Sequence, residues 1–457
     1  MRLILLPALL AVIPAFAQPP EDDAHARAVA AGYKALTLCS AHFNAGRDKA
    51  QVEALELHGI YPEYEAQVRA LQASVAEKAR TVSVPFDAAL PPRIAAWRPN
   101  LGCAQLPIGA DAKVVAALPH FDTRAPDLDR KPWPLGERGA TAKARGDAAA
   151  LKRAVAAAFD TPQFGEGHAT TGVVVLQDGK IVAERYRKGF GPHVAQRTWS
   201  VAKSLAGAVV GVAVREGVLK TTQPAPVPEW QRPGDPRAAI TLDQLLRMSS
   251  GLYSDTAGNR TDALYFGGAT VAEAATGWPL QAPPGTRFRY ANNDIVLAIH
   301  ALRARTGDDA RAFARPYTDL FWPLGMTRTH AETDWQGGFV LSSQVWSTAR
   351  DLARFGLLLQ GDGMFDGRRV LPEGWVHAAT TPSGPQPEGD LGYGATLWLL
   401  QRSPGVPADT FAALGNRGQV VAVVPSRKVV IVRRGEDPTG KRFDQAAFVA
   451  AVLAALD

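Results

Sequence analysis

Several common catalytic signatures are missing from this chain of 457 residues. It has no G-x-S-x-G nucleophile elbow, no H-E-x-x-H zinc signature and no P-loop, so these chemistries are not expected. Its 2 cysteines form no C-x-x-C pair and have no histidine cluster nearby, which argues against a metal site built on them. We therefore expect no metal and no organic cofactor.

Charge of one sign is not concentrated anywhere. Lysine and arginine number 50 against 44 aspartate and glutamate, and they are spread along the sequence. Nucleic-acid binding needs a concentrated basic patch, so no nucleic-acid partner is expected. The length allows two domains, or one large domain with an extension.

The N-terminus has the pattern of a signal peptide. Arg2 precedes an apolar run over residues 3–14, and Ala15-Phe16-Ala17 is typical of a cleavage site. The run is too short for a permanent span, and no other stretch is long and uncharged enough to be one. We predict a signal peptide over residues 1–17, cleavage after Ala17, a periplasmic or secreted protein, and no integral membrane segment after cleavage.

An oxidising compartment favours a disulfide between Cys39 and Cys103, with two buried free thiols as the alternative. Both cysteines lie in an N-terminal accessory segment, residues 18–146. Helical spacing of apolar residues over Ala26 to Leu38 and Tyr64 to Ala79 predicts helices up to about residue 80. From about Val82 the segment is Pro-rich and is expected to be irregular. Its role cannot be inferred from the sequence.

Residues 147–457 are predicted to form the main domain. Two strand-like runs, 171–176 and 180–186, flank Asp178-Gly179, a strong hairpin signal. Strands at both ends of the domain with helices between them predict an α+β fold, in which an antiparallel sheet is flanked by helices and adjoins a mainly helical region. The remaining expected elements are a helix over 148–159, the helical region over about 200–380, strands over 393–399, 418–424 and 428–433, and a helix over 444–456.

Ser200 and Lys203 stand three residues apart at the start of an apolar, small-residue segment that reads as a buried helix. On a helix such residues lie on one face, so the amine can take the proton from the hydroxyl. Burial and the helix N-terminus both disfavour the charged form of Lys203, and the Ser200 N–H can bind an oxyanion. The alternative is a capping serine beside a solvated lysine.

Four ordered segments resemble the serine β-lactamase and penicillin-binding-protein-like superfamily, nearest its class C and esterase/amidase branch. The resemblance covers about residues 165–455 and implies the fold described above. The segments are Thr198-Trp199-Ser200-Val201-Ala202-Lys203 for the nucleophile, Leu245-Leu246 with Ser250-Gly251-Leu252, Tyr290-Ala291-Asn292 for the Tyr-x-Asn motif, and Gly415-Asn416-Arg417-Gly418-Gln419 for the third motif.

The resemblance implies roles for Tyr290 and Asn292. Tyr290 is expected to be catalytic: near the lysine it is predicted to be held partly as phenolate and to relay a proton. Asn292 is expected to hold a substrate amide or to tether Lys203, with neighbouring Asn293 as a competing register. Without this context the alternatives are a packed tyrosine and a turn asparagine.

The third motif departs from the family pattern. Its first position is usually Lys or His, whereas Asn416 is neutral, and Arg417 is expected to point away from the cleft because neighbouring strand residues face opposite sides. Gly418 is predicted to admit the substrate, and the Gln419 N–H to complete the oxyanion hole with that of Ser200. A missing cation disfavours β-lactams, which carry a carboxylate, and favours neutral esters or amides.

The sequence thus predicts an exported serine hydrolase acting on a small ester, amide or peptide substrate through a Ser200 acyl-enzyme. One alternative is a β-lactamase or D-alanyl-D-alanine carboxypeptidase acting on penicillins or cell-wall peptides. The other is a non-catalytic binding or sensor protein of the same fold. Tyr253 and Asp255 are interpreted as ordinary loop residues, with a place in the cleft as the alternative.

Overall fold

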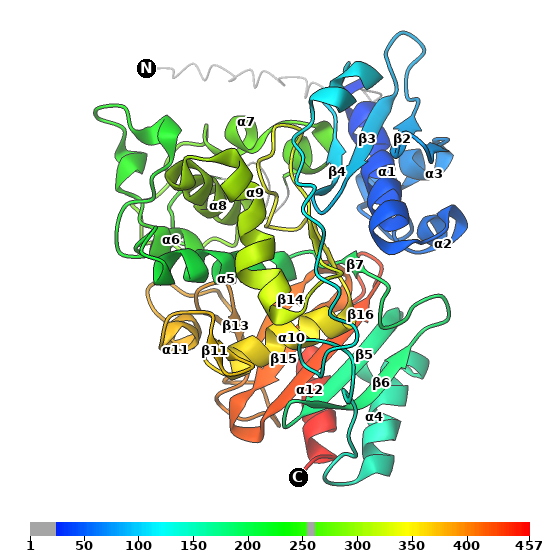
Figure 1. The fold of residues 1–457 in the computed structure, drawn as a ribbon, viewed down its shortest axis with the longest axis vertical. Helices are drawn as coiled ribbons and strands as arrows, with labels where there is room; N and C mark the ends of the chain where they lie inside the picture. The colour runs from blue at the N-terminus through cyan, green and yellow to red at the C-terminus, as the bar shows by residue number, and fades with distance from the viewer. Residues whose placement is uncertain (1–23, 254–260) are drawn as a thin grey trace, which may run out of the picture.

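A computed structural model describes residues 24–253 and 261–457 (Figure 1). The predicted signal peptide and Asp255 lie outside these residues. No helix within the described part combines the length and the apolar character that a bilayer crossing requires.

The main domain is built on one antiparallel sheet of seven strands, in the order β12-β13-β14-β15-β16-β5-β6. Strands from both ends of the domain therefore meet side by side, as the sequence predicts. The hairpin between β5 and β6 turns at Asp178 and Gly179, whose φ angles are 49° and 76°. The strands are β5 (Thr170–Gln177), β6 (Lys180–Tyr186), β12 (Gly392–Tyr393), β13 (Trp398–Leu399), β14 (Phe411–Gly415), β15 (Gln419–Val424) and β16 (Val429–Gly435).

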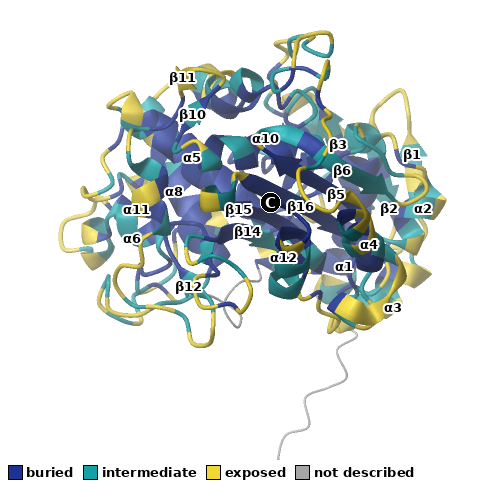
Figure 2. Ribbon diagram, turned by 90° about the horizontal axis from the view of Figure 1, so that it is seen from below, coloured by how far each residue is buried: buried dark blue, intermediate teal, exposed yellow. Residues whose placement is uncertain are grey.

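Helices cover both faces of this sheet. α4 (Ala148–Asp160) and α12 (Gln445–Ala454) pack on one face, and α10 (Ala349–Gln360) packs on the other against β15, β16 and β5. Because both faces are covered, β5, β15 and β16 are buried along their whole length (Figure 2).

A mainly helical region adjoins the sheet. Its centre is α5 (Val201–Arg215), in which every residue from Val201 to Ala213 is buried, and which packs against α8 (Asn292–Thr306). Small side chains on α5 allow its neighbours to approach closely. At Gly207, for example, an added Cβ would lie 2.4 Å from Oγ1 of Thr396, which lies between β12 and β13. The other elements are α6 (Leu242–Leu246), α7 (Val271–Ala275), α9 (Asp309–Arg315), α11 (Trp375–Thr380), the sheet β7-β9-β8 (Gln196–Arg197, Val345–Ser347, His330–Ala331) and the hairpin β10-β11 (Met364–Phe365, Arg368–Arg369).

The N-terminal segment forms its own layer beside the helical region (Figure 1). α1 (Ala24–Ala45) packs against a four-stranded sheet and against α3. The other elements are α2 (Lys49–Ala54), α3 (Pro62–Ala70), β1 (Ser74–Ala76), β2 (Thr81–Val84), β3 (Arg93–Arg98) and β4 (Gly102–Gln105), with the strands in the order β1-β2-β3-β4.

Two expectations for this segment were wrong. The helix predicted to reach Ala79 ends at Ala70, and strands occupy part of the stretch expected to be irregular. In β2 the apolar residues alternate, and Val82 and Val84 are fully buried. This period-2 signal spans only four residues and is followed by a Pro-rich loop, so the prolines dominated the pattern.

Other boundaries also differ. The strand expected over 393–399 is a pair of short strands, β12 and β13, that reverses where Thr396 adopts a φ of 61°. β15 begins at Gln419 rather than Gly418. The predicted disulfide between Cys39 and Cys103 is confirmed and joins α1 to β4, which excludes the free-thiol alternative.

Candidate active site

Ser200, Lys203 and Tyr290 lie together. Ser200 is the N-cap of α5, and Lys203 follows one turn later with its Nζ 2.9 Å from Ser200 Oγ. The same Nζ is 5.0 Å from the centroid of the Tyr290 ring, and the Tyr290 hydroxyl interacts by hydrogen bonding with the Ser200 side chain. The alcohol, amine and phenol identified from separate parts of the sequence therefore meet at one point.

Lys203 is a buried amine with three oxygen neighbours. Its side chain is 1% exposed, and besides Ser200 it hydrogen-bonds to Asn292 Oδ1 at 2.7 Å and to the Ser342 carbonyl oxygen at 2.9 Å. Burial, together with a smaller effect of the nearby Arg197 charge, lowers the pKa of Lys203 to about 7. Near neutral pH a substantial fraction of Lys203 is thus unprotonated and able to accept a proton.

Tyr290 has the opposite tendency. Burial raises the pKa of its phenol to about 12, because the hydrogen bonding with Ser200 and Trp398 offsets only part of the desolvation. The expected partial phenolate was therefore wrong for the free protein: the proton stays on the phenol, and Lys203 is the basic member of the pair.

Asn292, and not Asn293, holds Lys203. It is the first residue of α8, and its amide accepts from Lys203 through Oδ1 and donates to Thr261 Oγ1 at 2.9 Å through Nδ2. With both ends of the amide engaged, Asn292 fixes the direction of the lysine nitrogen. Of the two roles expected for Asn292, holding a substrate amide or tethering Lys203, these contacts support the tether.

The strand β14 ends directly against the nucleophile. A Cβ on Gly415 would lie 2.5 Å from the Thr198 carbonyl oxygen and 3.1 Å from the Ser200 backbone nitrogen. A glycine is required at this position because any side chain would force the strand away from α5. Gly415 and Asn416 both line the pocket at Ser200.

Gly418 and Gln419 do not line this pocket, contrary to the expectation. The side-chain amide of Gln419 donates through Nε2 to the carbonyl oxygens of Arg417 and Gly435, and its Oε1 accepts from Arg434 Nε at 2.7 Å. The chain turns through residues 416–418 before β15, so Gln419 pairs with Gly415 across the ladder. Its side chain is taken up by these hydrogen bonds to Arg417, Arg434 and Gly435 and does not reach the pocket. The sequence prediction assigned the close approach to the nucleophile to Gly418, whereas in the structure Gly415 makes it.

Arg417 points away from the pocket, as expected. Its φ is 56°, and its Nε donates to Glu436 Oε2 at 2.9 Å. Its other nitrogens bond to carbonyl oxygens of the N-terminal segment at Leu55, His58 and Gly59. Arg417 therefore fastens that segment to the loop beside the active site.

A pocket of about 470 Å³ opens above Ser200. Among the described residues that line it, none carries a charged side chain, and aromatic rings form much of its wall. The lining residues are Tyr61, Trp199, Ser200, Tyr265, Tyr290, Asn292, Ser343, Leu391, Trp398, Leu414, Gly415 and Asn416. Trp199 and Gly415 lie within the motif segments but were given no role in the site. No spacing signal in the sequence pointed to the other lining residues, Tyr61, Tyr265, Ser343, Leu391, Trp398 and Leu414.

Arg197 is a further residue that sequence analysis missed. Its side chain is buried, its Nη2 donates to Ser343 Oγ at 2.8 Å, and its Cζ lies 3.7 Å from the centroid of the Trp199 ring. Trp199 has a φ of 50°, a conformation that is strained for a bulky residue. The arginine thus packs on the residue that sets the entry into α5 and places a positive charge near Lys203.

Tyr253 lies outside the pocket. Its side chain is exposed, with its ring 5.4 Å from that of Trp278 and the Arg289 guanidinium 5.4 Å from its centroid. Its interpretation as an ordinary loop residue agrees with this placement.

Known proteins share the family and the fold of this chain. The Beta-lactamase family model matches residues 153–455. A 6-aminohexanoate-dimer hydrolase from Paenarthrobacter ureafaciens is 27% identical over 313 residues, which are 61% of this chain and 76% of that protein.

Two solved structures share the fold. A penicillin-binding protein homologue from Caulobacter crescentus has a TM-score of 0.52 at 18% identity and covers 69% of this chain and 99% of its own. A class C β-lactamase in complex with cefoxitin has a TM-score of 0.53 at 15% identity and covers 68% and 99%. From the family match and this arrangement of fold and site, the chain belongs to the beta-lactamase family of serine hydrolases.

Proposed function

We propose that this protein is an exported hydrolase that cleaves an uncharged amide or ester through an acyl-enzyme on Ser200. The hydrogen bonding of Lys203 carries the proposal. A neutral amine has two N–H donors and one lone pair. The carbonyl oxygens of Asn292 and Ser342 accept the two donors at 2.7 and 2.9 Å, which leaves the lone pair for the Ser200 hydroxyl at 2.9 Å.

In the first half of the reaction the Ser200 proton passes to Lys203 Nζ while Oγ bonds to the substrate carbonyl carbon. The carbonyl oxygen becomes an oxyanion, and we assign its binding to the backbone N–H groups of Ser200 and Asn416. Support comes from the position of Gly415 against Ser200 and from Asn416 lining the same pocket. Asn416 thus replaces Gln419 in this role.

Tyr290 is suited to protonate the leaving group. Its phenol retains a proton at neutral pH and interacts with Ser200, where the scissile bond must lie. As the bond to the leaving nitrogen or oxygen breaks, Tyr290 gives it a proton and is reprotonated from the Lys203 ammonium. Water then attacks the acyl-enzyme, its proton returns through the same groups, and Ser200 is released with the acid.

The pocket favours uncharged substrates. Its described lining has aromatic, apolar and neutral polar side chains. The neutral Asn416 occupies the motif position at which proteins of the resembled family usually carry Lys or His to bind a substrate carboxylate. The relative from Paenarthrobacter is named as a 6-aminohexanoate-dimer hydrolase, which supports an amide as the bond that is cleaved here. β-Lactams and cell-wall peptides carry a carboxylate, so we expect weak activity on them.

Export is supported by two observations on the chain. The first 17 residues have the signal-peptide pattern, and Cys39 and Cys103 form a disulfide, which persists in an oxidising compartment. N-terminal sequencing of protein recovered from the periplasm or medium should begin at Gln18. A full-length cytoplasmic product with reduced cysteines would contradict export.

The catalytic proposal is tested with a panel of substrates and a fluorophosphonate probe. Short-chain p-nitrophenyl esters, uncharged linear amides and a chromogenic cephalosporin are compared in the wild type and in Ser200→Ala. We expect turnover of esters or amides, poor turnover of the cephalosporin, and a single phosphonylated site at Ser200. Equal turnover by Ser200→Ala would refute the acyl-enzyme, and efficient cephalosporin hydrolysis would refute the substrate class.

A further inference from the structure

One wall of the pocket comes from outside the part of the chain that matches the family. The match begins at residue 153, whereas Tyr61 lies in the N-terminal segment, at the N-cap of α3, and lines the same pocket as Ser200. Its ring is half-buried and meets that of Tyr33 edge-on, with the centroids 6.4 Å apart. The accessory segment therefore reaches the site of chemistry.

The stretch that carries Tyr61 is fixed to the active-site loop. Arg417, adjacent to the pocket residue Asn416, donates to the carbonyl oxygens of Leu55 at 2.7 Å, His58 at 3.0 Å and Gly59 at 3.1 Å. The Thr439 N–H also donates to the Gly59 carbonyl oxygen at 2.7 Å. A buried guanidinium bonded to three carbonyls leaves this stretch little freedom, so Tyr61 is held at a defined distance from β14.

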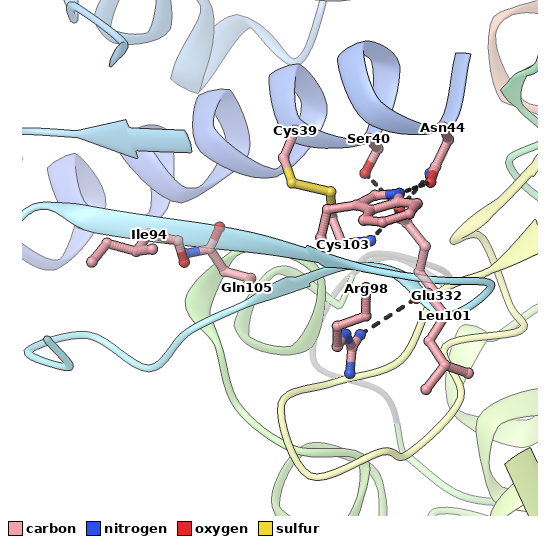
Figure 3. Close-up of a disulfide and its surroundings, with 10 residues drawn as sticks. Cys39, Ser40, Asn44, Ile94, Arg98, Leu101, Cys103, Gln105 and Glu332 are labelled. Carbon is pink, nitrogen blue, oxygen red and sulfur yellow. Dashed lines mark hydrogen bonds between the residues drawn. A yellow bond between two sulfur atoms is a disulfide. The ribbon is translucent and has the colours of Figure 1, made fainter. Parts of the chain in front are cut away.

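The rest of the segment is fastened by buried polar contacts. Glu332 of the main domain accepts from Ser40 Oγ at 2.6 Å, from Asn44 Nδ2 at 2.9 Å and from the Cys103 N–H at 3.0 Å (Figure 3). The disulfide shown beside these contacts joins α1 to β4 and encloses residue 61 within its loop. The segment is thus a permanent wall of the pocket.

We propose that Tyr61 is a specificity-determining residue: its ring is the surface on which an uncharged, apolar or aromatic arm of the substrate packs beside the scissile bond. This inference rests on the proposed function and names the class of substrate. The other walls are suited to the same arm, because Trp199, Tyr265 and Trp398 line the pocket and none of them is charged. Aromatic walls bury large apolar area and favour flat or extended partners.

The test compares small and large substrates in the same protein. One series is p-nitrophenyl esters from acetyl to octanoyl, and the other is acetate esters of phenol and naphthol. For Tyr61→Ala we expect the ratio of kcat/KM for the longest member to kcat/KM for the shortest member to fall about tenfold or more in at least one series, through KM rather than kcat. Tyr61→Phe should behave as the wild type, because the ring and not the hydroxyl provides the surface.

Tyr64→Ala is the matched control. Tyr64 lies on the same helix and bonds through its hydroxyl to Asp262 at 2.7 Å, but it does not line the pocket. The ratio of large to small substrate is independent of the fraction of folded protein, so it remains informative if either variant is less stable. An unchanged ratio in Tyr61→Ala, or the same change in Tyr64→Ala, would overturn the inference. Failure of the hydrolase proposal is separate, since it would appear as undiminished turnover by Ser200→Ala.

Discussion

Replacing Gly415 by alanine tests how closely β14 must approach the nucleophile. The added Cβ would lie 2.5 Å from the Thr198 carbonyl oxygen and 3.1 Å from the Ser200 nitrogen, whereas ordinary contacts begin at 3.4 Å. Both neighbours are backbone atoms at the start of a buried helix, so they cannot rotate aside. The strand must withdraw by most of an ångström.

Such a withdrawal is large for an oxyanion hole. A hydrogen bond of ordinary length lengthened by this amount is no longer one, so the contribution of the Asn416 N–H would be lost. Removal of one oxyanion donor lowers kcat by about 10²- to 10³-fold, or about 3–4 kcal/mol of transition-state stabilisation. We expect kcat for p-nitrophenyl acetate and the rate of fluorophosphonate labelling to fall together by this factor.

The matched control is Gly191→Ala, because a Cβ there would meet no atom within 4 Å. Circular dichroism and thermal unfolding should show that both variants are folded. If folded Gly415→Ala kept kcat within about threefold of the wild type, the assignment of the Asn416 N–H to the oxyanion hole would be refuted.

Three further predictions follow from individual contacts. The kcat/KM should rise with pH through a midpoint near 7, because the Lys203 ammonium cannot accept a proton and its pKa is lowered to about 7. Arg197→Gln should move this midpoint to higher pH in a pH–rate profile, since the arginine charge opposes protonation of Lys203. An unmoved midpoint would contradict the coupling between the two residues. Replacing Cys39 and Cys103 by serine opens a bridge of sequence separation 64 and should lower the free energy of unfolding in urea by about 4 kcal/mol; a loss below about 1 kcal/mol would show that the bridge constrains little. Arg417→Met should destabilise the fold by about 3–5 kcal/mol in the same assay, because it removes the cation paired with the buried Glu436 carboxylate and the donors to the carbonyl oxygens of the N-terminal segment. Wild-type stability would show that the ion pair is dispensable.

Local patterns predicted the sheet and the start of the site. The Asp178-Gly179 hairpin, the terminal strands and α12 depend on periods and turn residues within a few positions, so they can be inferred from the chain alone. The Ser200–Lys203 pair is likewise local, since one helical turn brings the two side chains together. The resemblance to known motifs added Tyr290 and Asn292, which no spacing rule would have connected to Ser200.

The parts that were missed depend on contacts between distant segments. Whether Gly415 or Gly418 faces the nucleophile is decided by the turn that follows β14 and by how that strand packs on α5. Burial raises the pKa of the Tyr290 phenol and keeps it protonated, whereas the sequence predicted a partial phenolate.

The amino-acid sequence determined the helix that presents the serine and lysine on one face, the strands of the sheet, and the pairing of the two cysteines. Only the tertiary structure decided the glycine at the nucleophile, the neutral aromatic wall and the place of Tyr61, which stands 139 positions before Ser200 in the sequence. The physical reason is that periodicity and turn chemistry act over a few residues. A pocket wall, by contrast, is set by close packing between elements far apart in the chain, and no local pattern records it.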